Sequence, residues 1–181
     1  MTYRVTAVCL GNICRSPMAE AVIRAQLRDA GLDDVSVDSA GTGAWHVGNG
    51  ADPRALQALQ ARGYALDHTA RQIDASWLEP RGAPEGAQPG GFAGPAAPDL
   101  VVAMDWSNHE DLRRMGVEDS RLRMLRSFDP SLAHLPHGHG ALEVPDPYYG
   151  AARGFDDVLD MLEAASRGLV DELRRSGVPT D

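Results

Sequence analysis

Short apolar runs alternate along the chain with segments in which hydrophobic side chains recur every three or four residues. The short runs predict buried strands, because a continuous apolar run suits a parallel sheet that is covered on both faces. The three- and four-residue spacing instead predicts helices with one apolar face. On this pattern the chain has strands at 3–8, 35–39, 98–104 and 124–128, and helices at 16–30, 54–62, 107–115 and 155–173.

Residues at the ends of the expected helices refine their boundaries. Ser16, followed by Pro17, is predicted to cap the first helix. Ser107 and Glu110 have the spacing of a capping box, which predicts the start of the third helix. A glycine follows each of the first three helices, as expected for a helix end: Gly31, Gly63 and Gly116.

The alternation of strands and helices favours a single α/β domain over residues 1–181. Its expected architecture is a Rossmann-like three-layer fold, an open four-stranded parallel sheet with helices on both faces. Ligands of such folds bind beyond the carboxyl ends of the strands, so the loop that begins at Cys9 is the expected site. The stretch 79–98 departs from the pattern, since ten of its twenty residues are Gly or Pro. We interpret it as an exposed loop insertion.

Composition excludes several classes of function. The net charge of −9 opposes binding of DNA or RNA, for which a basic surface is expected. No apolar run approaches the roughly 18 residues of a membrane span, and the first residues lack the layout of a signal peptide. Two cysteines cannot form a disulfide framework. We therefore expect a soluble, monomeric, cytoplasmic protein that binds no nucleic acid and no membrane, with export without a signal peptide left open.

The residues between the first strand and the first helix carry the clearest chemistry. Five residues separate Cys9 from Arg15, enough to curl around one tetrahedral anion with their backbone N–H groups pointing inward. The Arg15 guanidinium offers a planar fork to two phosphate oxygens. Cys9 is expected to act as a thiolate nucleophile facing the phosphorus atom. The expected phosphate-binding residues are Leu10, Gly11, Asn12, Ile13, Cys14 and Ser16.

Several separate segments resemble the low-molecular-weight protein tyrosine phosphatases, from Tyr3 to about Leu173 apart from the insertion. The matching segments are VCLGNICRSPMAEAV, SAGT, ADPRA, HTARQ, VVAMDWSNHEDL and DPYYG. The resemblance implies a phosphotyrosine protein phosphatase I-like fold and phosphotyrosine-containing protein substrates. It implies no cofactor.

The same resemblance implies a role for individual residues. Cys9 is the nucleophile, Arg15 clamps the phosphate, and Asp146 is the general acid that protonates the leaving phenolate. Asn12, Ser39 and His68 support the phosphate loop, and Ser16 tunes the thiolate. The expected substrate rim is formed by Trp45, Tyr148 and Tyr149.

Other functions on this loop remain as alternatives. A thioredoxin-linked arsenate reductase needs two further cysteines, whereas this chain has only Cys9 and Cys14, both in the loop. A reductase that uses small thiols does not need them, but it would have no use for the acid in the DPYYG segment. Phosphoarginine phosphatases of the family typically carry Thr where this chain has Ile13. A non-catalytic phosphate-binding module does not need Cys9, Arg15 and Asp146 together. Three histidines, His134, His137 and His139, lack a familiar ligand spacing, so no metal is expected.

Overall fold

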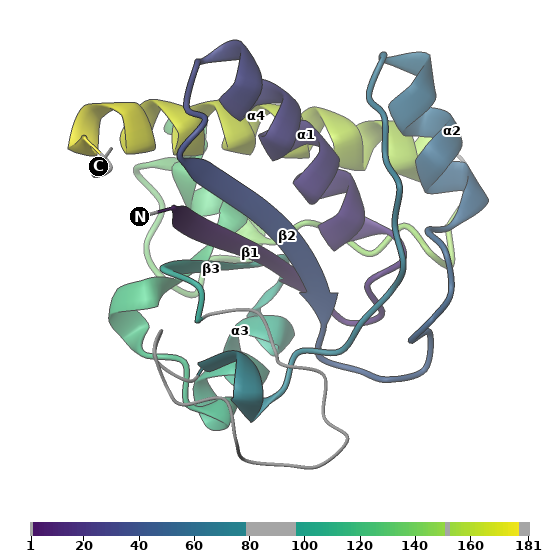
Figure 1. Ribbon diagram of the computed structural model, residues 1–181, viewed down its shortest axis with the longest axis horizontal. Coiled ribbons are helices and arrows are strands. Elements are labelled where there is room, and N and C mark those ends of the chain that lie inside the picture. Colours follow the sequence, from purple (N-terminus) through teal and green to yellow (C-terminus); the bar gives the residue numbers. More distant parts are fainter. Residues whose placement is uncertain (1, 79–96, 151–152, 178–181) are drawn as a thin grey trace.

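A four-stranded parallel sheet forms the centre of the fold in the computed structural model (Figure 1). The structure describes residues 2–78, 97–150 and 153–177. The strand order is β2-β1-β3-β4, and every neighbouring pair is parallel. The strands are β1 (Tyr3–Cys9), β2 (Val35–Gly41), β3 (Leu100–Ala103) and β4 (Leu122–Met124). The predicted α/β fold class is confirmed.

Helices cover both faces of this sheet, as Figure 1 shows. The helices are α1 (Arg15–Asp29), α2 (Pro53–Ala61), α3 (Trp106–Met115) and α4 (Arg153–Ser176). Helices α1, α2 and α4 lie on one face and α3 lies on the other. Side chains of β1 alternate between the two layers, since Val5 and Ala7 belong to the core under α1 and α4 and Val8 belongs to the core beside α3.

The expected strand at 124–128 is wrong over most of its length. The strand is Leu122–Met124, and Leu125–Phe128 forms a 3₁₀ turn in which the Ser127 hydroxyl donates to the Met124 carbonyl at 2.7 Å. Leu125 and Phe128 are both buried, and side chains three residues apart share a face in a helical turn but not in a strand. With Arg126 and Ser127 between its apolar residues, this short segment does not by itself separate the two conformations.

The two predicted serine caps are also wrong, whereas the glycine stops are correct. Helix α1 begins at Arg15 with Cys14 in the cap position, and the Ser16 hydroxyl points into the interior instead. Helix α3 is capped by Asp105, whose carboxylate accepts from the backbone N–H of Asn108. The backbone at Asp105 is extended, as is typical of a residue that precedes a helix. This conformation lets the Asp105 side chain reach the free N–H groups of the first turn. The glycines after α1, α2 and α3 all have positive φ.

The Gly/Pro-rich stretch predicted at 79–98 lies outside the described residues except for its last two positions. Within the part of the chain that the structure describes, no helix is long and apolar enough to cross a membrane.

Gly168 allows α4 to approach the backbone of the 3₁₀ turn at Phe128. A Cβ atom built at this position would lie 1.8 Å from the Phe128 carbonyl oxygen. Replacing a glycine by alanine inside a helix ordinarily gains up to about 1 kcal/mol. Here the backbone of the turn would have to move, and overpacking of this kind costs typically 1–3 kcal/mol.

We therefore expect Gly168→Ala to lower the free energy of unfolding by about 1–3 kcal/mol in urea denaturation. Gly154→Ala, in the same helix, is the control, because its Cβ would meet Pro147 Cβ at an ordinary 3.7 Å. A Gly168→Ala protein at least as stable as the wild type would contradict this account of the α4 contact.

Candidate active site

The loop between β1 and α1 curls around the Cys9 sulfur. The backbone N–H of Asn12 donates to Cys9 Sγ at 3.3 Å, and Asn12 itself has a φ of 54°, in the left-handed region. Asparagine tolerates this region better than other residues with a side chain. The predicted curled loop is therefore present, with Cys9 at the end of β1 and Arg15 at the start of α1.

Ser16 contacts the sulfur from the helix side. Its Oγ lies 3.0 Å from Cys9 Sγ and accepts a hydrogen bond from Asn12 Nδ2 at 2.9 Å. Since the asparagine amide occupies one acceptor position, the hydroxyl hydrogen can point to Cys9 Sγ or to the Ala40 carbonyl at 3.3 Å. Ser16 is thus able to donate to the sulfur, as the sequence predicts.

Buried hydrogen bonds fix the conformation of Asn12. Its Nδ2 also donates to Ser39 Oγ at 3.0 Å, and its Oδ1 accepts from the backbone N–H of Arg71 at 2.9 Å. The Asn12 carbonyl accepts from His68 Nε2 at 2.7 Å. Ser39 in turn donates to the buried Glu20 carboxylate at 2.6 Å. The structure therefore brings the three predicted supporting residues together in one network, and the network holds the strained turn in place.

Glycine at the end of β2 makes room for the loop. A Cβ atom at Gly41 would lie 2.6 Å from the Leu10 carbonyl oxygen and 3.1 Å from the Asn12 nitrogen. The backbone after Gly41 is bonded to the loop, since the N–H groups of Thr42 and Gly43 donate to the carbonyls of Cys9 and Leu10 at 2.9 Å each. Any side chain at position 41 would displace the loop that surrounds the sulfur.

Arg15 is buried and held by carboxylates from two other segments. Its Nη1 donates to Asp105 Oδ2 at 2.6 Å and to the Val144 carbonyl at 3.1 Å, and its Nη2 donates to Asp146 Oδ2 at 3.1 Å. Burial alone would lower the pKa of Arg15, but Cys9, Asp105 and Asp146 raise it above its ordinary value. The guanidinium therefore remains charged at the base of the site.

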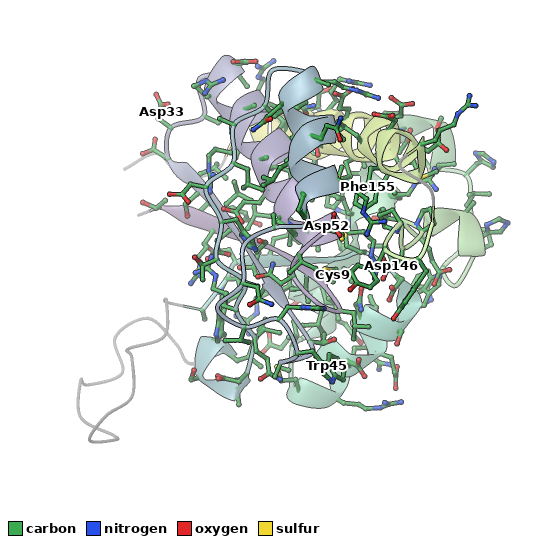
Figure 2. The ribbon with its side chains drawn as sticks, turned by 90° about the vertical axis from the view of Figure 1, so that its right-hand side faces the viewer. Cys9, Asp33, Trp45, Asp52, Asp146 and Phe155 are labelled. Atoms are coloured by element: carbon green, nitrogen blue, oxygen red, sulfur yellow. The ribbon has the colours of Figure 1, made fainter. Side chains whose placement is uncertain are left out.

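A cavity of about 320 Å³ opens above this loop. Its lining residues are Cys9, Leu10, Gly11, Ile13, Cys14, Arg15, Trp45, His46, Asp146, Tyr148 and Tyr149. The predicted rim is therefore at the cavity, with 76% of Trp45 and 93% of Tyr149 exposed. Figure 2 shows Cys9 and Asp146 close together, with Trp45 farther from them.

Cys14 faces away from solvent on the same loop. Both cysteines are free thiols, and Cys14 is buried. Burial, and after it the negative charges of Asp52, Cys9 and Asp146, together raise the pKa of Cys14 to about 12. Cys14 is therefore a neutral thiol at physiological pH.

Two residues of the site have no role in the sequence-based prediction: Asp105 and Glu20. Asp105 directly follows the buried run that contains β3, a position at the carboxyl edge of the sheet where ligand-binding residues are expected. Glu20 gives no such signal, because its partner Ser39 is distant in sequence. Among the described residues, no group of three or more His, Cys, Asp or Glu side chains is arranged to hold a metal ion.

Comparisons with known proteins agree with this geometry. A family model described as "Low molecular weight phosphotyrosine protein phosphatase" matches residues 4–81 and 92–178. A low molecular weight protein-tyrosine-phosphatase of Streptomyces coelicolor is 49% identical over 178 residues, which cover 96% of this chain and 95% of that protein. Low molecular weight protein-tyrosine phosphatase A of Mycobacterium tuberculosis is 48% identical over the same shares of the two chains.

The solved structures that resemble this chain include a tyrosine phosphatase and an arginine phosphatase. A protein tyrosine phosphatase from Entamoeba histolytica matches with a TM-score of 0.77 and 31% identity, covering 98% of this chain and 100% of that one. A drosophila arginine phosphatase matches with a TM-score of 0.74 and 26% identity, covering 94% and 97%.

The raised pKa of Cys14 predicts that this thiol resists alkylation in the folded protein. With a pKa of about 12, its thiolate fraction at pH 8 is on the order of 10⁻⁴. Cys9→Ser removes the charge of Cys9 but keeps burial, the largest cause of the raised pKa, so after treatment of this protein with iodoacetamide at pH 8 we expect mass spectrometry to find Cys14 largely unmodified. The same protein in guanidinium chloride should be modified. Alkylation of folded Cys14 at the rate of a free cysteine would contradict the burial described here.

Proposed function

The chain belongs to the low molecular weight phosphotyrosine protein phosphatase family and is a phosphoric monoester hydrolase of the protein-tyrosine-phosphatase type, and we propose that Cys9, Arg15 and Asp146 carry its reaction. The observation that supports the proposal is their meeting in one cavity. The Cys9 sulfur lies inside the curled loop, and the Asp146 carboxylate contacts Arg15 at the edge of that loop. These three groups are a nucleophile, a phosphate clamp and an acid.

The substrate phosphate binds where Arg15 now meets Asp146. The guanidinium fork and the backbone N–H groups of the loop hold the phosphate oxygens, while the start of α1 adds a favourable dipole. Asp105 stays bound to the other side of Arg15 and keeps its orientation. Negative charge that develops on the oxygens in the transition state then meets donors that are already in position.

The first chemical step transfers the phosphoryl group to Cys9. The thiolate attacks phosphorus, the bond to the phenolic oxygen breaks, and the Asp146 proton passes to that oxygen. In this step Asp146 acts as the proton donor, so it enters the step as the carboxylic acid. Ser16 donates to the sulfur and stabilises the thiolate when it is free.

The second step returns the enzyme to its starting state. Water attacks the phosphorus of the phosphocysteine, and the Asp146 carboxylate takes a proton from that water. The sulfur–phosphorus bond breaks, the Cys9 thiolate re-forms, and inorganic phosphate leaves. The carboxyl group is then protonated again for the next cycle, so protons and electrons balance over both steps.

An aromatic ester fits the cavity better than a guanidino phosphate. Ile13 lines the cavity with an apolar side chain, and Tyr148 also lines it. The exposed Trp45 can flank a flat ring from the rim. These residues favour phosphotyrosine over phosphoarginine, although an arginine phosphatase shares the fold.

We also propose that residues 1–181 form one phosphatase domain with an insertion near 79–98. The family model supports this division, because it leaves only a short segment unmatched between residues 81 and 92. The described elements on either side of the insertion belong to the same parallel sheet.

Cys9→Ser tests the covalent mechanism. Turnover of a phosphotyrosine peptide should fall to background, because the serine hydroxyl is a far weaker nucleophile at neutral pH. Binding of inorganic phosphate, measured by calorimetry, should persist, since the loop amides and Arg15 remain. Phosphoarginine hydrolysis and arsenate reduction by the wild type are measured in parallel. Faster turnover of either alternative than of the tyrosine ester, or turnover by Cys9→Ser within tenfold of wild type, would refute the proposal.

Asp146→Asn tests the general acid. We expect kcat/KM for an aryl phosphate with a basic phenolate to fall by about 10²–10⁴, the usual contribution of a general acid. The ratio kcat/KM is the appropriate measure because it reports steps up to the first irreversible one, departure of the phenol. An aryl phosphate with a very acidic phenol needs little protonation and should lose much less. Equal losses for both substrates would assign Asp146 another role.

A further inference from the structure

Arg54 and Asp52 form a two-point ion pair at the start of α2. Arg54 Nε donates to Asp52 Oδ1 at 3.0 Å, and Arg54 Nη2 donates to Asp52 Oδ2 at 2.8 Å. The same carboxylate caps α2 by accepting the Arg54 backbone N–H at 2.8 Å. A planar guanidinium held at two points has a fixed direction, so its remaining donors also point in a fixed direction.

Those remaining donors reach the loop that carries Asp146. Arg54 Nη2 donates to the Tyr148 carbonyl at 3.0 Å, and Nη1 approaches the Gly150 carbonyl at 3.4 Å. The guanidinium also stacks on rings, with its carbon 5.7 Å from the Tyr148 centroid and 4.7 Å from the Phe155 centroid. Figure 2 shows Asp52, Phe155 and Asp146 gathered on the side of the molecule where Cys9 lies.

Tyr148 connects this contact directly to Asp146. Its backbone N–H donates to Asp146 Oδ1 at 3.1 Å, while its carbonyl accepts from Arg54. On the opposite side of the pair, the backbone N–H of Asp52 donates to the Ile13 carbonyl at 2.8 Å. Arg54 and Asp52 therefore join the phosphate loop to the loop that carries the acid.

This link becomes important when substrate binds. The Asp146 carboxylate contacts two partners in the structure, Arg15 Nη2 and the Tyr148 N–H. A bound phosphate takes over Arg15 Nη2, and 40% of the Asp146 side chain is exposed. The Tyr148 N–H then remains to orient the carboxyl group, and the position of Tyr148 depends on Arg54.

We propose that Arg54 is a positioning residue for the general acid: by holding Tyr148, it keeps the Asp146 carboxyl group at the leaving oxygen once phosphate has displaced it from Arg15. The proposal rests on the proposed function of Asp146. Arg54 does not touch the reacting atoms. Its removal should therefore affect the proton transfer and leave phosphate binding intact.

Arg54→Met is the central variant, because methionine fills space without donating a hydrogen bond. We expect kcat/KM for an aryl phosphate with a basic phenolate to fall by about 10- to 100-fold, the range for a catalytic group misplaced by about 1 Å. For an aryl phosphate with a very acidic phenol, the loss should stay within about threefold, since that leaving group needs little protonation. The inhibition constant of inorganic phosphate should be unchanged.

Arg62→Met is the matched control at the other end of the same helix. Arg62 also pairs with carboxylates, at 2.6 Å from Asp160 and 3.2 Å from Glu163. Its side chain is 29% exposed, against 35% for Arg54, but it joins α2 to α4 away from the cavity. Arg62→Met should leave both kcat/KM values at wild-type level. A loss of stability common to the two variants therefore does not mimic the expected kinetic difference.

The double variant Arg54→Met with Asp146→Asn shows whether Arg54 acts through Asp146. If it does, adding Arg54→Met to Asp146→Asn should change kcat/KM by less than about twofold, because coupled residues are non-additive. Multiplied losses in the double variant would overturn the proposal. Equal losses of Arg54→Met on both substrates, or no loss on either, would also overturn it.

Two further measurements keep this test separate from that of the proposed function. Wild-type turnover of the aryl phosphates and the substrate selectivity of Asp146→Asn are measured first. If the wild type shows no turnover, or if Asp146→Asn shows no selectivity, the function proposed for the site is refuted, whatever Arg54→Met does.

If Arg54→Met does not fold, Arg54→Lys replaces it. A lysine retains the charge but cannot hold Asp52 at two points, so the same selective loss, smaller in size, is expected. Wild-type selectivity in Arg54→Lys would then overturn the proposal.

Discussion

The buried positive charge of Arg15 determines how the site is built. A charge that has lost its water needs opposite charges and hydrogen bonds in its place. Asp105 and Asp146 supply carboxylates, and the Val144 carbonyl accepts a further hydrogen bond. Because these partners come from the start of α3 and from the loop before α4, one guanidinium brings two distant segments of the chain to the end of β1.

The same charge explains how an acidic protein can bind a phosphate. The net charge of −9 is spread over the whole chain, whereas the field at the loop is set by Arg15, by converging N–H groups and by the start of α1. Asn12 holds those N–H groups in a strained turn, and Ser39 and His68 keep Asn12 in place. The donors are therefore ordered before the substrate arrives, which is the condition for strong stabilisation of a transition state.

Features with local signals could be predicted from the sequence, and features with distant partners could not. The first three strands, the glycine stops and the loop from Cys9 to Arg15 all have signals in adjacent residues. Ser16 has the appearance of a helix cap for the same reason, but its hydroxyl contacts the Cys9 sulfur and the Ala40 carbonyl, which lie on two strands. The turn Leu125–Phe128 could not be told from a strand, because two apolar residues separated by Arg126 and Ser127 do not define a period.

Asp52 and Asp105 show why helix caps belong to this site. Each carboxylate accepts a backbone N–H at the start of a helix with Oδ1 and an arginine side chain with Oδ2. In a parallel α/β fold, helices begin near the carboxyl ends of the strands, so the caps lie beside the ligand. The arginines that they hold connect segments far apart in the chain, since Arg15 and Asp105 are 90 residues apart, and Arg54, held by Asp52, contacts Tyr148 at a separation of 94 residues. The sequence points to Ser107 and not to Asp105 as the cap of α3, and only the fold reveals that the second oxygen of each capping aspartate holds an arginine at the candidate site.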